Sequence, residues 1–315
     1  MTIIPPLIQS VKELQVLYDK GINIAQYLRE KYGGNNSPKV VEFAYDLQAG
    51  TYCEHYMRDE AFKNHYKNIA MELSNIVQRY YPNASSILEA GIGEGNCIGE
   101  LLNYFNGNVE SAGFDISWSR LAYARKWLND KGYKKSTLFT GDLLDIPCAE
   151  NSFDIVYTNQ AVEPNRGSEE KIIRELYRVA RKYLIMIEPS YELASEEAKK
   201  RMDAHGYVRG LESIAKENNY NVIEYRLSPY YFNPLNPTAI MVIEKGGECV
   251  HDFKIACPQF KSKLENIDGA LYSAEAMRVY PIINGIPCLR IESGIVASKY
   301  ELFAKEHNVI PCDQQ

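Results

Sequence analysis

The sequence lacks any apolar stretch that approaches the roughly 20 residues needed for a membrane-spanning helix. Its first residues, MTIIPPLIQS, also lack the basic segment and the apolar core of a secretory signal peptide. No internal repeat or low-complexity tract is visible along the chain. These absences argue against a membrane protein and a secreted one, and we expect a globular protein of the cytoplasm with no membrane partner.

Paired cysteines are missing as well. The seven cysteines are an odd number, they are scattered, and they form no C-x-x-C pair. This pattern is typical of reduced thiols and predicts neither a disulfide framework nor a zinc site, so we expect no bound metal.

Basic residues are also fewer than acidic ones. The chain has 35 Lys and Arg against 41 Asp and Glu, a net charge of −6, and no basic tract longer than pieces such as KGYKK. This balance disfavours nucleic acid as a partner, although a local basic groove could still exist. Tyrosine, in contrast, is abundant at 24 residues, which is compatible with a tyrosine-lined pocket for a small molecule.

The order of elements changes near residue 82. The first 80 residues carry apolar side chains at three- and four-residue spacing and read mostly as helix. Beyond them, β-type runs alternate with helical segments, which indicates a parallel sheet covered on both faces. Strands are expected at 86–90, 109–115, 137–142, 153–159 and 183–189, with helices at about 95–105, 117–130, 167–181 and 192–218. The runs 221–227 and 238–245 follow without a helix between them and predict a hairpin-like terminal pair.

A glycine-rich turn in SILEAGIGEGNCIGELL joins the first of these strands to a helix. Gly91, Gly93 and Gly95 are spaced G-x-G-x-G, whereas a dinucleotide fingerprint would have a further glycine where Asn96 stands. Glu89, just before the turn, would repel a pyrophosphate. The turn therefore favours a ligand with an ammonium or sulfonium group over a dinucleotide.

Acidic residues stand at the ends of three successive predicted strands, namely Glu89, Asp115 and Asp142. Asp115 is placed to accept hydrogen bonds from two ribose hydroxyls. Asp142 could accept a hydrogen bond from the amino group of an adenine, with the backbone of Leu143 at the ring edge. An adenosine with a cationic amino-acid tail would satisfy all three carboxylates, whereas taken singly each could simply cap the following helix.

The ordered set LEAGIGEG, GFDIS, GDLLDIP and FDIVYTNQAVE resembles the successive motifs of class I S-adenosylmethionine-dependent methyltransferases, over about residues 60–247. The resemblance implies an α/β, Rossmann-like seven-stranded sheet of order 3-2-1-4-5-7-6 with the last strand antiparallel, S-adenosylmethionine as cofactor and S-adenosylhomocysteine as its product. Carried over by position, the resemblance implies that the methionine moiety of the cofactor contacts Glu89, Gly91 and Gly93. The ribose and adenine would contact Asp115 and Ile116, and the adenine would also contact Asp142 and Leu143. Asn159 and Gln160 would lie beside the reactive methyl group.

Methyl transfer from a sulfonium is an in-line displacement, which depends mainly on positioning and needs a base only if the acceptor must lose a proton. The candidate catalytic groups are His205, Glu163 and Asn159. The candidate substrate contacts are Tyr45, Tyr52, Tyr56, Glu188 and Tyr191. The alternative for His205 is a helix end in solvent, and the alternative for the three tyrosines before residue 58 is simple packing.

The C-terminal tail resembles the small zinc-ribbon-like activator module of tRNA and protein methyltransferases, through CP at 257 and YPIINGIPCL at 280–289. Of the four ligand positions that this resemblance implies, only Cys257 holds a cysteine, and Phe260, Ser273 and Ala276 occupy the others. We therefore expect a metal-free module held by apolar packing.

The resemblances divide the chain into a helical cap or substrate lid at 1–58, the methyltransferase domain at 59–247 and the small α+β module at 248–315. The leading hypothesis is a methyltransferase acting on oxygen or nitrogen of a small molecule, in natural-product or glycan biosynthesis, with a homodimer among the roles open to the tail. An RNA or protein methyltransferase and a non-catalytic partner subunit that binds S-adenosylmethionine remain alternatives, and a dehydrogenase is disfavoured by Glu89 and Asn96.

Overall fold

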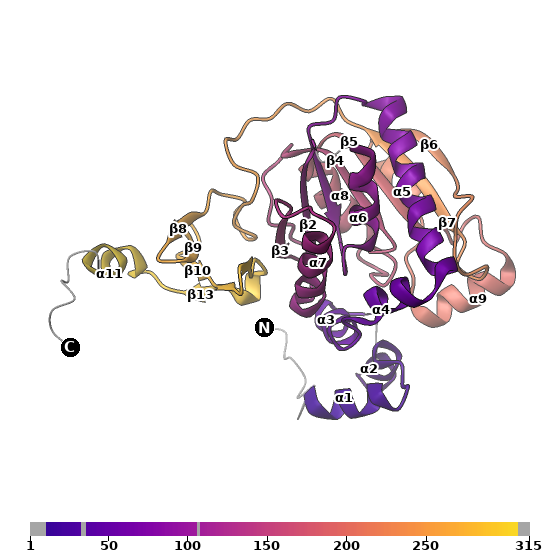
Figure 1. The fold of residues 1–315 in the computed structure, drawn as a ribbon, viewed down its shortest axis with the longest axis horizontal. Coiled ribbons are helices and arrows are strands. Elements are labelled where there is room, and N and C mark those ends of the chain that lie inside the picture. Colours follow the sequence, from indigo (N-terminus) through magenta and orange to yellow (C-terminus); the bar gives the residue numbers. More distant parts are fainter. Residues whose placement is uncertain (1–10, 33–35, 106–107, 308–315) are drawn as a thin grey trace.

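The computed structural model describes residues 11–32, 36–105 and 108–307. Among the described residues, five helices precede the first strand: α1 (Val11–Asp19), α2 (Ile24–Tyr32), α3 (Pro38–Leu47), α4 (Thr51–Arg58) and α5 (Glu60–Tyr80). Side-chain caps define two of them, because Ser37 accepts the backbone N–H of Val40 and Asp59 accepts those of Ala61 and Phe62. The first three helices pack on one another around a small apolar cluster of their own, and Figure 1 shows α1 and α2 below the sheet domain.

A seven-stranded sheet follows. Its strands are β1 (Ser86–Ala90), β2 (Glu110–Asp115), β3 (Thr137–Thr140), β4 (Phe153–Asn159), β5 (Ala180–Pro189), β6 (Asn221–Leu227) and β7 (Thr238–Glu244). They are ordered β3-β2-β1-β4-β5-β7-β6, and β7 runs antiparallel to both of its neighbours. The predicted fold class, the strand order and the terminal antiparallel pair are confirmed.

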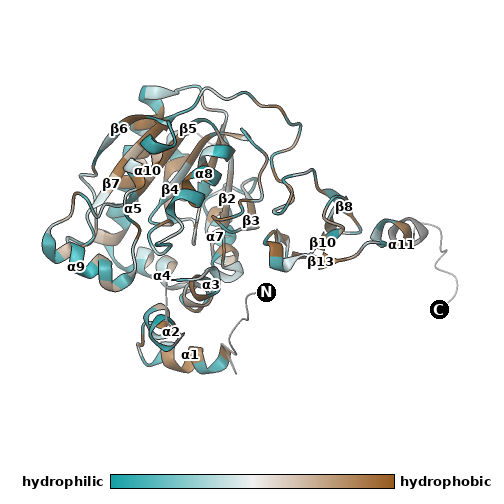
Figure 2. Cartoon of the chain, turned by 180° about the vertical axis from the view of Figure 1, so that it is seen from behind, coloured by the Kyte–Doolittle hydropathy of each residue, from teal (hydrophilic) through white to brown (hydrophobic). Residues whose placement is uncertain are grey.

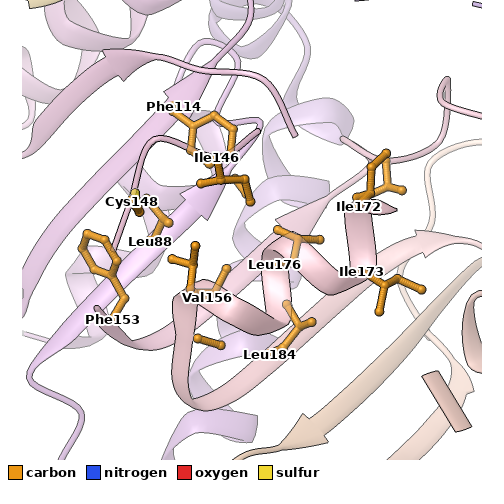
Figure 3. Packing of buried hydrophobic residues seen from close by; sticks show 14 of the residues in the cluster. Leu88, Phe114, Ile146, Cys148, Phe153, Val156, Ile172, Ile173, Leu176 and Leu184 are labelled. Carbon is orange, nitrogen blue, oxygen red and sulfur yellow. The ribbon is translucent and has the colours of Figure 1, made fainter. Parts of the chain in front are cut away.

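Both faces of the sheet are buried, so the strands are nearly all apolar rather than alternating with polar residues. On β1, Ile87 packs with α5, α6 (Asn96–Leu101) and α7 (Trp118–Asp130), whereas Leu88 packs with α8 (Glu169–Val179) on the opposite face. Figure 3 shows this second core, in which Leu176 and Ile173 of α8 meet the strand residues. The two helical layers hold the carboxyl ends of the parallel strands at one edge, where the predicted ligand contacts lie.

The segment expected as one helix at 192–218 is instead two helices. These are α9 (Glu196–His205) and α10 (Leu211–Glu217). Gly206 ends α9 in the left-handed conformation, with φ of 68°, a geometry that glycine adopts at low cost. Likewise, the helix expected at 95–105 ends as α-helix at Leu101 and continues as a 3-10 turn, η1 (Leu102–Phe105).

The C-terminal segment forms short strands beside the β3 edge of the large sheet (Figure 1). Its elements are β8 (Glu265–Ile267), β9 (Ala270–Ser273), β10 (Arg278–Tyr280), β11 (Ile282–Ile283), β12 (Ile286–Pro287), η2 (Ile291–Ser293), β13 (Ile295–Val296) and α11 (Tyr300–His307). The segment is joined to the sheet domain by backbone bonds, because Leu289 donates to the Thr140 carbonyl at 3.2 Å and Ala149 donates to the Lys254 carbonyl at 2.8 Å. Cys257, Tyr280 and Leu289 are buried in the same core as α8.

The four expected ligand positions of the tail do not converge as a metal site. The Sγ of Cys257 lies 3.7 Å from the Tyr280 hydroxyl, Ser273 is buried and caps the Ala276 N–H, and Phe260 is 54% exposed. Within the described ranges, no group of three or more His, Cys, Asp or Glu side chains is arranged to hold a metal ion. The absence of zinc stays a prediction.

A buried ion pair ties this tail to the N-terminal helices. Arg290, whose side chain is 7% exposed, contacts Glu42 of α3 at 2.7 Å. Glu42 also contacts Lys39 at 3.1 Å, and Lys39 is largely exposed.

The hydropathy view in Figure 2 shows mixed polar and apolar helices, and no helix among the described residues is long and apolar enough to cross a membrane.

Candidate functional site

The glycine turn after β1 brings the backbone close to two neighbouring segments. Gly91 has φ of 76°, and a Cβ placed there would lie 2.3 Å from the Cβ of Ala161. A Cβ on Gly93 would lie 2.5 Å from the Nη2 of Arg120. At Gly91 both the positive φ and the contact with Ala161 require glycine, whereas at Gly93, with φ of 54°, the backbone conformation favours glycine and the Arg120 side chain would have to shift for any other residue.

Three carboxylates surround this turn, as the sequence predicted. Glu89 is 2% exposed and accepts the Ile98 N–H at 3.1 Å. Asp115 accepts the N–H groups of Gly93 and Ser117, each at 2.9 Å, and so fixes the turn relative to β2.

Burial disfavours the charged form of two of these acids. It raises the pKa of Glu89 to about 8, and it also raises the pKa of Asp142. Asp142 lies beyond the end of β3 and accepts the Leu144 N–H at 2.9 Å. A cation bound beside Glu89 would restore the ionised carboxylate, so the site is suited to a positively charged ligand group.

A single cleft brings most of the predicted residues together. It encloses about 920 Å³ of empty space, part of which is open to solvent. The predicted residues that line it are Glu89, Gly91, Gly93, Asp115, Ile116, Asp142, Leu143, Asn159, Gln160, Glu163, Tyr45 and Tyr52.

The N-terminal helices form one wall of this cleft. The ring centres of Tyr45 of α3 and Tyr52 of α4 lie 5.2 Å and 4.7 Å from the guanidinium carbon of Arg120. Arg120 in turn contacts the glycine turn at Gly93. Burial raises the pKa of both tyrosines, so their hydroxyls stay protonated. Glu94 of the turn accepts the N–H groups of Gly50 at 2.9 Å and of Cys53 at 2.6 Å, at the start of α4.

Arg120 and Glu94 were not predicted from the sequence. Arg120 stands five residues after Asp115, where its position on α7 carries no signal that distinguishes it from a surface arginine. Glu94 lies inside the glycine motif, between Gly93 and Gly95, where the motif itself does not specify a residue type. Together these residues link the N-terminal helices to the glycine turn.

Glu188 of β5 does not line the cleft but supports its wall. It is 2% exposed and accepts the N–H groups of Ala161, Val162 and Glu163, at 3.0, 3.1 and 3.2 Å. Burial, with the neighbouring Glu163, raises the pKa of Glu188 to about 8. Its role in the structure is to hold the loop after β4, on which Glu163 faces the cleft.

The remaining candidates lie outside the residues that line the cleft. Tyr56 donates to Glu100 and packs against Trp127, because α4 turns this side chain into the core. Tyr191 stacks on Arg209 at 3.8 Å.

His205 is likewise placed away from the lining residues, at the last position of α9. Its Nδ1 lies 3.0 Å from the Arg201 carbonyl, and its ring contacts Tyr207. The geometry is that of a helix-terminal histidine, which was the alternative to a catalytic role.

Glu163 lines the cleft on the loop that follows β4. It receives a hydrogen bond from the Nδ2 of Asn236 at 3.3 Å. Burial raises its pKa to about 7, and Asn236, Arg201 and Tyr207 lower it only in part. A carboxyl group with this pKa can take up or release a proton near neutral pH.

Comparison with known proteins agrees with this geometry. Residues 87–183 match the family described as a methyltransferase domain, a range that runs from β1 into β5 and includes the glycine turn. The fold is similar to that of magnesium protoporphyrin IX methyltransferase from Synechocystis PCC 6803 with bound SAH, with a TM-score of 0.51 at 14% identity over 66% of this chain and 100% of that chain. The same enzyme with bound SAM gives a TM-score of 0.50 at 14% identity over 68% of this chain and 99% of that chain.

These structures share the fold, and the family match covers the glycine turn and the strand ends that line the cleft. Residues 87–183 therefore match a methyltransferase domain, within a sheet that has the strand order expected of class I methyltransferases.

Proposed function

We propose that this protein transfers a methyl group from S-adenosylmethionine to an oxygen or nitrogen atom of a small-molecule acceptor. The observation that carries this proposal is the single cleft, in which three strand-end carboxylates and a glycine turn face tyrosines of the N-terminal cap. The cap leaves limited room beside the cofactor, which favours a small acceptor such as a natural product or a glycan precursor over a macromolecule.

The residues present fit the cofactor. Two buried side-chain donors that belong to the cleft lining, Asn96 Nδ2 and Arg120 Nε, have no hydrogen-bond partner among the described residues. Buried polar groups are rarely left in this state, so a polar ligand is expected to complete them. The close approach of Gly91 to Ala161 supports the same reading, because this turn tolerates no side chain.

Each strand-end acid has a defined part in holding the cofactor. Glu89 would bind the ammonium group beside the glycine turn. Asp115 already accepts two backbone N–H groups, and a carboxylate has roughly four lone-pair sites, so it can accept two ribose hydroxyls as well. Asp142 and the Leu143 backbone would bind the adenine, with Ile116 against its ring.

When bound, the cofactor supplies an electrophilic methyl group on a sulfonium. The part of the protein is to hold the acceptor in line with that group and to exclude water. Asn159 and Gln160, at the end of β4, stand where the resemblance places the methyl group, and Glu163 follows on the same loop. Tyr45 and Tyr52 cover the acceptor from the cap.

The test is a calorimetric titration of the purified protein with S-adenosylmethionine, S-adenosylhomocysteine and a nicotinamide dinucleotide. We expect micromolar binding of the first two and none of the third. Asp115→Asn is expected to weaken binding about tenfold to a hundredfold, because charged hydrogen bonds to the ribose are lost. Asp130→Asn is the matched control, since Asp130 is 63% exposed at the end of α7 and pairs with Lys126.

Because Asp115 also holds the glycine turn, the unfolding midpoint of each variant is measured alongside. Dinucleotide binding without binding of S-adenosylhomocysteine would overturn the proposal. Equal affinity of Asp115→Asn and wild type for S-adenosylhomocysteine would remove Asp115 from the site.

A further inference from the structure

The wall formed by the loop after β4 presents hydrogen-bond acceptors to the cleft. The Oδ1 of Asn159 is buried and has no partner among the described residues. The Glu163 carboxylate has roughly four lone-pair sites, and Asn236 and Tyr207 fill two of them. Because both side chains line the same cleft, a ligand that satisfies them must bring several polar hydrogens.

Glu163 also lacks a direct counter-ion. No Lys, Arg or His nitrogen of the described residues lies within 4.0 Å of its carboxylate, and Arg201 acts on it only at longer range. An ionised carboxylate at a desolvated position is costly unless a cation pairs with it. The cleft lining includes one cation, Arg120 beside Tyr45 and Tyr52, but no cation of the described residues is in contact with the Glu163 carboxylate.

We propose that the methyl acceptor is an amine, which enters the cleft as an ammonium ion, pairs with Glu163 and donates a hydrogen bond to Asn159. This inference rests on the proposed methyltransferase function and selects nitrogen over oxygen as the atom methylated.

The proton and electron balance of the step is complete within the site. The Glu163 carboxylate takes one proton from the ammonium ion and leaves a neutral amine with a lone pair. That lone pair forms the new N–C bond as the C–S bond of the sulfonium breaks, and the C–S electrons remain on sulfur as a neutral thioether. The methylated amine leaves as an ammonium ion, and Glu163 releases its proton to solvent.

The number of polar hydrogens argues against an alcohol or a phenol. Such a group has one O–H and cannot donate to both Glu163 and Asn159, whereas an ammonium ion carries two or three N–H donors. A carboxylate or phosphate acceptor would place a negative charge beside Glu163 and, behind it, Glu188.

The charge state of Glu163 makes this recognition dependent on pH. The polar groups that face it come from several elements: Tyr45 of α3, Tyr52 of α4, Arg201 of α9, Tyr207 after α9, Glu188 of β5 and Asn236 before β7. Of these, only Glu188 also has a pKa near neutrality, and it is fixed by three backbone N–H groups. With the pKa of Glu163 at about 7, affinity for an ammonium ion should rise about tenfold between pH 6 and pH 8.

The test uses the full chain saturated with S-adenosylhomocysteine and three probes with the same ring but different polar groups: benzylamine, benzyl alcohol and benzoate. Binding is measured by ligand-detected NMR titration at pH 6 and pH 8. We expect benzylamine to bind about tenfold more tightly than benzyl alcohol at pH 8, and benzoate to bind weakest. Glu163→Gln should remove this preference and the pH dependence, whereas Glu197→Gln, an exposed change on α9, should preserve both.

A second measurement identifies the methylated atom. The wild-type protein is incubated with a small-molecule extract and S-adenosylmethionine that carries a ¹³C-labelled methyl group, and the product methyl resonance is assigned as N-bound or O-bound. An N-methyl signal supports the inference, and an O-methyl signal overturns it.

The outcomes separate this inference from the proposed function. Failure of the wild-type protein to bind S-adenosylhomocysteine would count against the function itself. If S-adenosylhomocysteine binds to wild type and to Glu163→Gln alike, but benzylamine shows no preference over benzyl alcohol, the amine inference alone is overturned. The same holds if the preference persists in Glu163→Gln.

Discussion

Removing either partner of the Arg290–Glu42 ion pair should cost unequal amounts of stability. Arg290 is nearly buried, with 7% of its side chain exposed, and its second acidic neighbour, Glu292, lies 3.7 Å away. Glu42 is 24% exposed and keeps Lys39 at 3.1 Å if the arginine is lost. The glutamate therefore has a substitute partner, and the arginine has a weak one.

The magnitudes follow from this asymmetry. Glu42→Met leaves a buried guanidinium poorly compensated, which costs about 3 kcal/mol of unfolding free energy. Arg290→Met fills a similar volume and leaves Glu42 paired, so about 1 to 2 kcal/mol is expected. The double variant should lie close to wild type, within about 1 kcal/mol, because a buried pair replaced by apolar side chains is often neutral.

The assay is urea denaturation of the four members of this double-mutant cycle, with Lys39→Met as the control. Lys39 is 55% exposed, so its loss should change the unfolding free energy by less than about 1 kcal/mol. The reasoning is refuted if Arg290→Met costs as much as Glu42→Met. It is also refuted if the two single losses simply add in the double variant, since that would mean the side chains do not interact.

Three further perturbations have defined outcomes. The pKa of Glu163 is raised from 4.5 to about 7, so its neutral form stabilises the folded protein fully below pH 4.5, and this stabilisation is lost as the pH rises to 7. The midpoints of urea unfolding should therefore fall over this pH interval, and they should fall less in Glu163→Gln. Gly91→Ala should cost at least about 1 kcal/mol more than Gly132→Ala, because both glycines have positive φ but only Gly91 faces Ala161, and equal unfolding midpoints would contradict this. Metal analysis of the purified protein should find far less than one zinc per chain, and about one equivalent would show that the C-terminal module binds metal by other ligands.

Much of the fold could be predicted because the local sequence patterns indicate the same strands and helices that the sheet domain contains. The glycine turn, the strand-end acids and the alternation of strands with helices are local signals, and each fixes a position at the carboxyl edge of a parallel sheet. Glu89, Asp115 and Asp142 meet in one cleft because parallel strands end at the same edge. No long-range information was needed for this part of the site.

The acceptor end of the cleft was harder to predict. Tyr45, Tyr52 and Tyr56 look equivalent in the sequence, but α3 and α4 direct the first two to the cleft and turn Tyr56 toward Glu100. Which of the three tyrosines faces the cleft depends on how the N-terminal helices pack on the sheet, and no periodic pattern in the sequence predicts that packing. Glu188 shows the same limit, since a strand-end acid can face a ligand or support a loop from behind.

Arg120 and Arg290 were missed for a related reason. Each is an arginine in an ordinary helix or loop sequence, and its burial arises from contacts more than 60 residues away, with Tyr52 and with Glu42 respectively. Such pairs become visible only when the cap, the sheet and the tail are placed together.

The attachment of the tail to β3 has a consequence for the order in which the protein is completed. The wall that carries Asp142 is bonded at Thr140 to Leu289, a residue that is synthesised much later than β3. This contact spans 149 residues, and it also occupies the outer side of β3, an edge strand whose unpaired groups would otherwise be open to another chain. During synthesis, the part of the cleft wall next to Asp142 is therefore completed only after residue 289 has been made, and a chain that stops short of residue 289 leaves Thr140 on this strand edge without that contact.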